Sequence, residues 1–263
     1  MQKLLLIVIA VPLFGQELTL NLRSRVEPYK GSGQWQEVQI RQRLEPNKAA
    51  IVICDVWDRH WCQGATERVA GLAPAIDRLI GVARGRGVLI IHAPSDTMEF
   101  YKDSPQRKAI LAIPPAAPPP PLDLASPPLP IDDSDGGCDT PGDKSHKAWS
   151  RQHASIRIAE PDLVSDKGPE VYSTLRSRGV THLLVTGVHT NMCILNRGFA
   201  IKQMTKWGIR CILVRDLTDA MYNPRKPPHV SHSEGTEVVI QHIEKYWCPT
   251  VLSSDLLREL SNR

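Results

Sequence analysis

Residues 182–194 read HLLVTGVHTNMCI, and this stretch decides the fold that we expect for the whole chain. Its apolar run, 183–185, is too short for a helix and stops before Gly187, which predicts a strand buried on both faces. A helical pattern follows over 191–207. Cys193 therefore falls at the start of a predicted helix, directly after a central strand. Helix N-terminal amides lower the pKa of a thiol and stabilise an oxyanion, so this place suits a nucleophile. A lone cysteine after a strand is more often a packed core residue, so the assignment depends on partners elsewhere in the chain.

The segments on both sides continue this alternation of strands and helices. Short apolar runs bounded by turn residues predict strands, and apolar residues at i, i+3 and i+4 predict amphipathic helices. Strand, helix and strand at this spacing form right-handed units with a parallel sheet. The predicted strands are 49–54, 88–91, 183–185, 211–214 and 251–252, with 156–166 extended, and the predicted helices are 66–86, 168–178, 191–207 and 236–246. We expect an α/β fold of three layers, doubly wound around a mostly parallel, six-stranded sheet.

The N-terminus has the pattern of a secretory signal peptide, which we assign to residues 1–16. Lys3 supplies a positive start, and an unbroken apolar run follows over 4–11. The run is too short to span a membrane, and a buried N-terminal strand is the alternative. We therefore expect a secreted or periplasmic protein with no membrane span after removal of the signal.

Two further segments surround or interrupt the main domain, which we place at 49–260. Residues 17–48 alternate apolar and polar side chains around a glycine-rich turn, which predicts an N-terminal β extension. Residues 112–148 form a proline-rich insert that excludes a helix or a central strand. Its last part, 131–143, reads IDDSDGGCDTPGD and is interpreted as a solvated acidic turn.

The net charge bears on the possible binding partners, and the positions of the cysteines bear on disulfide pairing. The formal net charge of +4 is spread along the chain, so no nucleic-acid partner is expected. Cys54 and Cys211 lie in apolar strand-like runs and are interpreted as inert core residues. Cys62, Cys138 and Cys248 lie in loop-like sequence, and we expect one disulfide among these three, which export would permit.

A cleft for chemistry is expected at the carboxyl ends of the strands. In open parallel sheets ligands bind there, near the point where strand order reverses. Asp55 ends the strand 49–54, so it is placed to meet Cys193 and to act as its base. Burial of a carboxylate raises its pKa towards neutrality. Lys167, between an extended segment and a helix, is a candidate for the cation that holds the thiolate.

Three motifs in this order resemble the isochorismatase-like cysteine hydrolase superfamily, which includes nicotinamidases and N-carbamoylsarcosine amidases. They are IVICD ending in Asp55, DLVSDK ending in Lys167, and GVHTNMC ending in Cys193. Asp216 and a later histidine, His229 or His232, also fit. The resemblance covers about residues 49–255, interrupted by the insert, and implies an isochorismatase-like, Rossmann-like fold.

The resemblance also implies a mechanism. Cys193 would attack the carbonyl of a small amide to give a thioester, Asp55 would take its proton and later activate water, and Lys167 would stabilise the charges. The superfamily carries a non-proline cis peptide before the nucleophile, here Val188–His189. Such a bond would turn the amides of His189 and Cys193 towards one oxyanion. The chain would then be an amidohydrolase acting on C–N bonds other than peptide bonds.

The remaining expectations concern the pocket, a metal and two other functions. The substrate pocket is expected to involve Trp57, His60, Trp61, His92 and Asn191. No cofactor is expected to be required; a divalent metal, if bound, would be held by Asp58, His60 and His92, or Asp96 in place of His92. The partner is a small-molecule amide, and a homo-oligomer remains open. The alternatives are an ester or enol-ether hydrolase of the same fold, and a non-catalytic binding protein with the insert as its partner surface.

Overall fold

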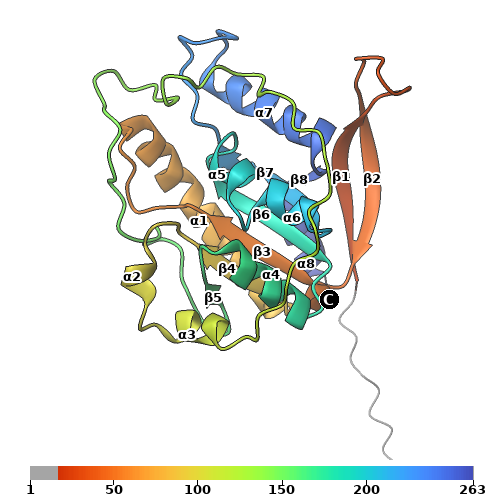
Figure 1. Cartoon of the computed structure of the whole chain (residues 1–263), viewed down its shortest axis with the longest axis vertical. Helices are drawn as coiled ribbons and strands as arrows, with labels where there is room; N and C mark the ends of the chain where they lie inside the picture. The colour runs from red at the N-terminus through yellow and green to blue at the C-terminus, as the bar shows by residue number, and fades with distance from the viewer. Residues whose placement is uncertain (1–16, 263) are drawn as a thin grey trace, which may run out of the picture.

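A computed structural model describes residues 17–262, and they form one sheet with helices on both faces (Figure 1). The sheet has eight strands in the order β2-β1-β8-β7-β6-β3-β4-β5. The strands are β1 Leu18–Val26, β2 Gln36–Leu44, β3 Ala49–Cys54, β4 Leu89–Ala93, β5 Leu163–Val164, β6 His182–Val188, β7 Arg210–Asp219 and β8 Thr250–Val251. The predicted signal peptide, residues 1–16, lies outside the described residues.

The six strands from β8 to β5 are all parallel to their neighbours, which confirms the predicted core of the sheet. The N-terminal extension is a β1–β2 hairpin, as expected, but it joins the same sheet and brings the strand count from six to eight. Its contact with the core is antiparallel and short, with Arg23 opposite Thr250 as the paired residues.

The helices cover the two faces of the sheet and complete the predicted three layers. They are α1 Gln63–Gly85, α2 Met98–Tyr101, α3 Pro105–Leu111, α4 Gly168–Ser177, α5 Cys193–Asn196, α6 Ile201–Lys206, α7 His232–Tyr246 and α8 Ser253–Ser261, with a 3₁₀ turn at Pro46–Lys48. Alternate residues of β3 show the layering. Ile51 and Ile53 pack in the cluster that holds α1 and α8, whereas Val52 and Cys54 pack in the cluster that holds α4, α6 and α7.

Strand order reverses between β3 and β6. The chain passes from β3 to β4 and β5 in one direction and from β6 to β7 and β8 in the other. The two strands run side by side from the pair Ala49 and His182 to the pair Cys54 and Gly187. Residues that directly follow these strands therefore meet at the switch point, where a cleft is expected in this class of fold.

The single helix predicted over 191–207 is wrong, because the chain forms α5 and α6 with a break at Arg197 and Gly198. Arg197 has an extended backbone, with ψ 146°. Gly198 lies against Gly168, where an added Cβ on Gly168 would sit 2.3 Å from the Gly198 carbonyl oxygen. This close approach of two backbones replaces the helical turn that the apolar spacing predicted.

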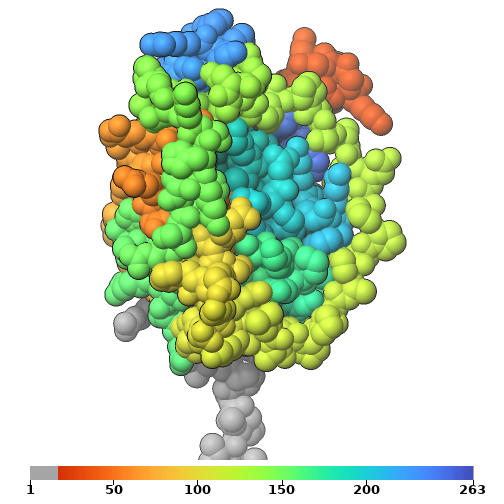
Figure 2. Space-filling model, turned by 60° about the vertical axis from the view of Figure 1, so that its left-hand side comes forward, coloured from red at the N-terminus to blue at the C-terminus, as the bar shows by residue number. Residues whose placement is uncertain are grey.

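The proline-rich insert follows the molecular surface without helix or strand, as predicted for 112–148. Figure 2 shows it in yellow-green beside the green and cyan helices. Two hydrogen bonds hold its first part: the N–H of Leu122 donates to the Lys206 carbonyl at 2.9 Å, and that of Ala116 to Ser173 Oγ at 2.9 Å. Across 17–262, every helix is too short or too polar to cross a membrane.

Gly187→Ala should lower the free energy of unfolding by roughly 2–4 kcal/mol, because the new Cβ meets backbone in a left-handed conformation. Gly187 has φ +112°, and a Cβ there would lie 2.1 Å from the Cys54 carbonyl oxygen. Urea unfolding of the full chain measures the change. The control is Gly179→Ala, where φ is +63° with open space around the Cβ. Equal losses in both variants would mean that the approach of β3 to β6 does not require glycine.

Candidate active site

The structure brings Asp55 and Cys193 together at the switch point. The Cys193 thiol makes a hydrogen bond to the Asp55 carboxylate, and the backbone N–H of His189 donates to the same sulfur. Asp55 is fully buried directly after β3, and Cys193 is partly buried as the first residue of α5. A carboxylate base in contact with a thiol is the arrangement that nucleophilic cysteine catalysis requires.

Asp55 is held in place through both of its carboxylate oxygens. Oδ1 accepts a hydrogen bond from the Ser95 N–H at 2.7 Å, and Oδ2 accepts one from Arg197 Nε at 2.9 Å. Its backbone adopts φ +49°, a left-handed conformation that is uncommon outside glycine. Burial raises the pKa of Asp55, and the positive charge of Arg197 and the hydrogen bonds from Ser95 limit that rise.

The pKa of the Cys193 thiol is raised by burial and then by the negative charge of Asp55, whereas the sequence predicted a lowered value. The prediction assumed a long helix after Cys193, but α5 has only four residues and supplies little dipole. Burial and the Asp55 charge thus both favour the protonated thiol, and the Asp55 carboxylate is the acceptor in contact with it.

Arg197 stands where the resemblance implied Lys167. Lys167 has a side chain that is 61% exposed and lies 3.2 Å from Asp166, and no contact between it and Asp55 or Cys193 is found in residues 17–262. Arg197 is the cation on Asp55, and its second ion pair is with Asp96 at 3.3 Å. The sequence signal for Arg197 is its place four residues after the nucleophile, about one helical turn away.

The peptide bond Val188–His189 is cis, as the resemblance implied. It places the His189 N–H beside the Cys193 sulfur and leaves the His189 ring 1% exposed. Burial lowers the pKa of His189 to about 3 and, with the nearby Arg68 charge, that of His60 to about 4. The two rings contact each other at 4.9 Å between centroids, so this wall of the site is neutral at physiological pH.

Aromatic rings stack beside this wall. Trp57 lies against Trp149 at 4.2 Å between centroids, and His60 lies nearly parallel to Trp149 at 5.8 Å. Trp57 is 5% exposed and its Nε1 donates to the Ser95 carbonyl at 3.0 Å. Trp149 comes from the end of the insert, and its position gave no sequence signal. His60 and Trp61, two of the expected pocket residues, line an open hollow of about 780 Å³.

His92 and Asn191 were expected in the pocket, but both side chains are held by hydrogen bonds to other parts of the chain. The ring nitrogens of His92 lie 3.0 Å from Gln152 Oε1 and 3.0 Å from Asp162 Oδ2. The strand β4 runs to Ala93, so His92 points into the buried sheet rather than out of its end. Asn191 is 1% exposed, with its amide bonded to Asp133 and to the backbone of Met221.

The four residues considered as metal ligands, Asp58, His60, His92 and Asp96, are not found as a group of ligands within residues 17–262. Asp58 accepts hydrogen bonds from the N–H and hydroxyl of Ser150, and His92 is held as described above. The one group of three potential ligands within 17–262 is Cys62, Cys138 and Asp143. Cys62 and Cys138 form a disulfide, which is one of the pairs that the sequence left open.

Asp216, the later aspartate that fitted the resemblance, does not lie at the end of its strand. The strand β7 ends at Asp219, five residues beyond its predicted end at 214, and Asp216 instead binds the N–H of Ser253 at 2.7 Å. Asp219 pairs with His232 at 2.9 Å and with Arg68 at 2.9 Å. Of the two histidines that fitted the resemblance, His232 is therefore the one in a charged network.

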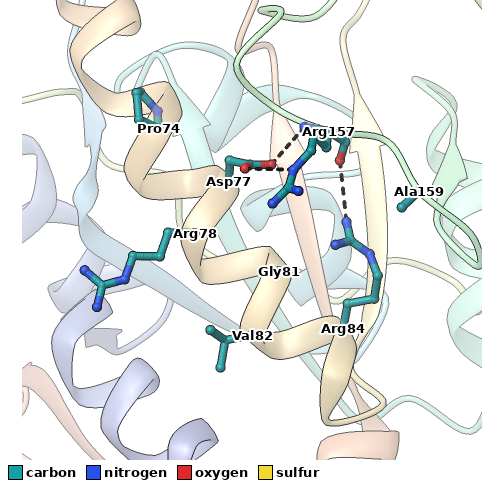
Figure 3. Close-up of a pocket in the computed structure, with 8 residues that line it drawn as sticks. All are labelled: Pro74, Asp77, Arg78, Gly81, Val82, Arg84, Arg157 and Ala159. Atoms are coloured by element: carbon teal, nitrogen blue, oxygen red, sulfur yellow. Dashed lines mark hydrogen bonds and ion pairs between the residues drawn. The ribbon is translucent and has the colours of Figure 1, made fainter.

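A second hollow, of about 510 Å³, lies along the outer face of α1 (Figure 3). Arg157 pairs there with Asp77 at 3.2 Å, and Arg84 and Arg78 extend from the same helix. None of the residues that line it belongs to the cluster of Asp55, Cys193 and Arg197. We do not assign this surface groove to the chemistry.

Comparison with known structures agrees with this architecture. A cysteine hydrolase from Pseudomonas syringae pv. phaseolicola 1448A aligns over 84% of this chain and 96% of its own, with a TM-score of 0.53 and 17% identity. The chain therefore shares the fold of this cysteine hydrolase. An isochorismatase from Pseudomonas putida KT2440 aligns over 80% of this chain and 91% of its own, with a TM-score of 0.47 and 16% identity. No protein-family model matches the sequence, and no curated protein matches it significantly.

Arg197→Gln should move the pH profile of Cys193 alkylation by iodoacetamide to higher pH. Loss of the guanidinium charge raises the pKa of Asp55 further, so the carboxylate becomes a base only at higher pH, and it also removes a stabilising charge from the thiolate. The measurement is the alkylation rate of the Cys193 peptide between pH 5 and 9. The matched variant Lys167→Gln should leave the profile unchanged. A larger shift in Lys167→Gln than in Arg197→Gln would show that Lys167 is the cation that acts on Cys193.

Proposed function

We propose that this chain is a cysteine hydrolase that cleaves a C–N bond of a small amide through a thioester, with Cys193 as nucleophile. The observation that carries the proposal is the hydrogen bond between the Cys193 thiol and the buried Asp55 carboxylate, which Arg197 holds from its other side. The shared fold with a cysteine hydrolase supports the same reading.

The first step is proton transfer from the thiol to Asp55. Burial raises the pKa of Asp55, which brings its proton affinity closer to that of the thiol, as a general base requires. Sγ then attacks the amide carbonyl carbon, and the electron pair of the C=O bond moves to oxygen. Arg197 keeps its charge throughout and compensates the thiolate that forms.

The oxyanion is stabilised by backbone amides at the cis peptide. The His189 N–H already donates to the sulfur, and we propose that the N–H of Cys193 is the second donor, as the resemblance implies. Collapse of the tetrahedral intermediate expels the amine, which takes the proton from Asp55. Asp55 then removes a proton from water, and the resulting hydroxide attacks the thioester. The C–S bond breaks, the carboxylic acid leaves, and the proton on Asp55 returns to Sγ, which restores the thiol and the carboxylate.

The substrate is proposed to be small and neutral at the end that meets His60. The partly exposed rings of His60 and Trp149 are uncharged, and each contacts a buried ring, that of His189 or Trp57. A planar amide matches such surfaces through stacking and hydrogen bonds. The residues named in these steps need no metal or organic cofactor to perform them.

We also propose that the protein works outside the cytoplasm. The support is the Cys62–Cys138 disulfide, since such bonds persist in oxidising compartments and are rare in a reducing cytosol.

Cys193→Ala should abolish hydrolysis across a panel of small amides and N-carbamoyl compounds, because the thiol that is hydrogen-bonded to Asp55 is lost and the thioester cannot form. Release of ammonia or amine is the measurement. Cys248→Ala, which removes a buried cysteine from the core, should retain activity. Turnover that survives in Cys193→Ala would exclude the covalent mechanism.

Asp55→Asn should slow the alkylation of Cys193 at pH 7 by on the order of a hundredfold, because the amide cannot accept the thiol proton. Iodoacetamide is the probe, and mass spectrometry of the Cys193 peptide gives the rate. A rate that is slow in the wild type and unchanged in Asp55→Asn would identify an ordinary thiol. That result would favour the binding-protein alternative.

A further inference from the structure

The turn that carries Cys193 is held from outside by the acidic loop, residues 131–143. The contact is between Asn191, two residues before the nucleophile, and Asp133 of the loop. Asn191 Nδ2 donates to Asp133 Oδ2 at 2.8 Å and to the Met221 carbonyl at 3.0 Å, and its Oδ1 accepts from the Met221 N–H at 2.8 Å. Three hydrogen bonds thus fix one buried side chain of the nucleophile turn.

Asp133 is used for this contact and not for an ion pair. Within residues 17–262 its carboxylate has Asn191 as its side-chain partner and pairs with no cation. A carboxylate that accepts from a buried amide makes a charge-assisted hydrogen bond, which is stronger than a neutral one. The acidic loop was expected to be a solvated turn, so this inward-directed carboxylate is a correction to the sequence interpretation.

Further contacts anchor the loop, and three of them connect it to Met221 and to the start of α1. The Cys62–Cys138 disulfide ties it to the residue before α1. Gly137 lies against the Met221 carbonyl, where a Cβ would be 2.2 Å from the oxygen. Asp139 forms an ion pair of 2.7 Å with Arg68 of α1. Met221 is therefore enclosed between Gly137 on one side and Asn191 on the other.

We propose that the acidic loop is a clamp in which Asp133 and Asn191 position the nucleophile turn, and that the Cys62–Cys138 disulfide keeps the clamp closed. The inference rests on the proposed function for its consequence at Cys193. Reduction by a small dithiol would transfer two electrons and two protons to the disulfide, giving two thiols and an oxidised dithiol. No bond to Cys193 changes; the turn loosens, and the thiol loses its fixed place beside Asp55.

The test compares full-length variants by hydrogen exchange and by alkylation. Hydrogen-exchange mass spectrometry of residues 188–196 reports the order of the turn, and the pH profile of Cys193 alkylation reports its place beside Asp55. Asp133→Ala removes the acceptor, and Asp133→Asn restores an oxygen that Asn191 can use. Asp123→Ala makes the same charge change at an exposed position of the insert. Dithiothreitol followed by desalting, and the double variant Cys62→Ala with Cys138→Ala, open the disulfide.

We expect faster exchange over 188–196 in Asp133→Ala, in the reduced protein and in the double cysteine variant. In the same samples the pH at which Cys193 is alkylated at half its maximal rate should move to about 8.5, the pKa of an ordinary cysteine thiol. Asp133→Asn and Asp123→Ala should behave as the wild type. The proposal is overturned if Asp133→Ala exchanges like Asp123→Ala, if reduction changes neither readout, or if exchange rises while the alkylation profile stays fixed.

The two proposals fail in different ways. An alkylation rate that is independent of Asp55 in the wild type removes the proposed hydrolase chemistry. The exchange comparison between Asp133→Ala and Asp123→Ala then still decides whether the clamp exists. Conversely, a primed Cys193 with unchanged exchange in Asp133→Ala keeps the hydrolase and removes the clamp.

Discussion

A buried negative charge at the switch point of the sheet governs the local architecture. Asp55 is fully buried, and an isolated carboxylate in that environment would cost several kcal/mol or lose its charge. Arg197, the Ser95 amide and the Cys193 thiol each approach it. The left-handed backbone at Asp55 and the break after α5 are the conformations that bring these groups together. The surrounding groups thus stabilise the charge of the Asp55 carboxylate, and the carboxylate can still accept a proton.

The parts of this arrangement that follow strand ends were predictable. Asp55 follows one buried apolar run, and the Cys193 turn follows another. If both runs are strands of one parallel sheet, their carboxyl ends lie at the same edge, whatever the conformation of the loops. The cation was not predictable by the same logic. Whether Lys167 or Arg197 reaches Asp55 depends on the backbone contact between Gly168 and Gly198, which interrupts a helix that the apolar spacing would have continued.

Errors of two to five residues in where a strand ends had larger effects on the pocket than on the fold. The sheet was predicted with its six parallel strands, but β4 and β7 extend beyond their predicted ends. Because alternate residues of a strand face opposite sides, these extensions turned His92 into the core and made Asp219 the last residue of its strand. The hairpin joined the sheet through one paired position, Arg23 with Thr250, and neither segment alone encodes that register.

The order of strands in the sheet has a consequence for how the chain reaches its native state. The central pair joins Ala49 to His182, and the hairpin is completed on the sheet only by β8, near the end of the chain. Such a topology has high contact order, so long loops must close, at a cost in chain entropy, before core contacts can stabilise them. A newly made chain can pair β1 with β2 and β3 with β4 early, but the second edge of β3 stays unpaired until β6 has been made, and that of β1 until β8 has been made. Unpaired strand edges are templates for association with other chains, so these two edges are the places where a nascent chain is exposed to it.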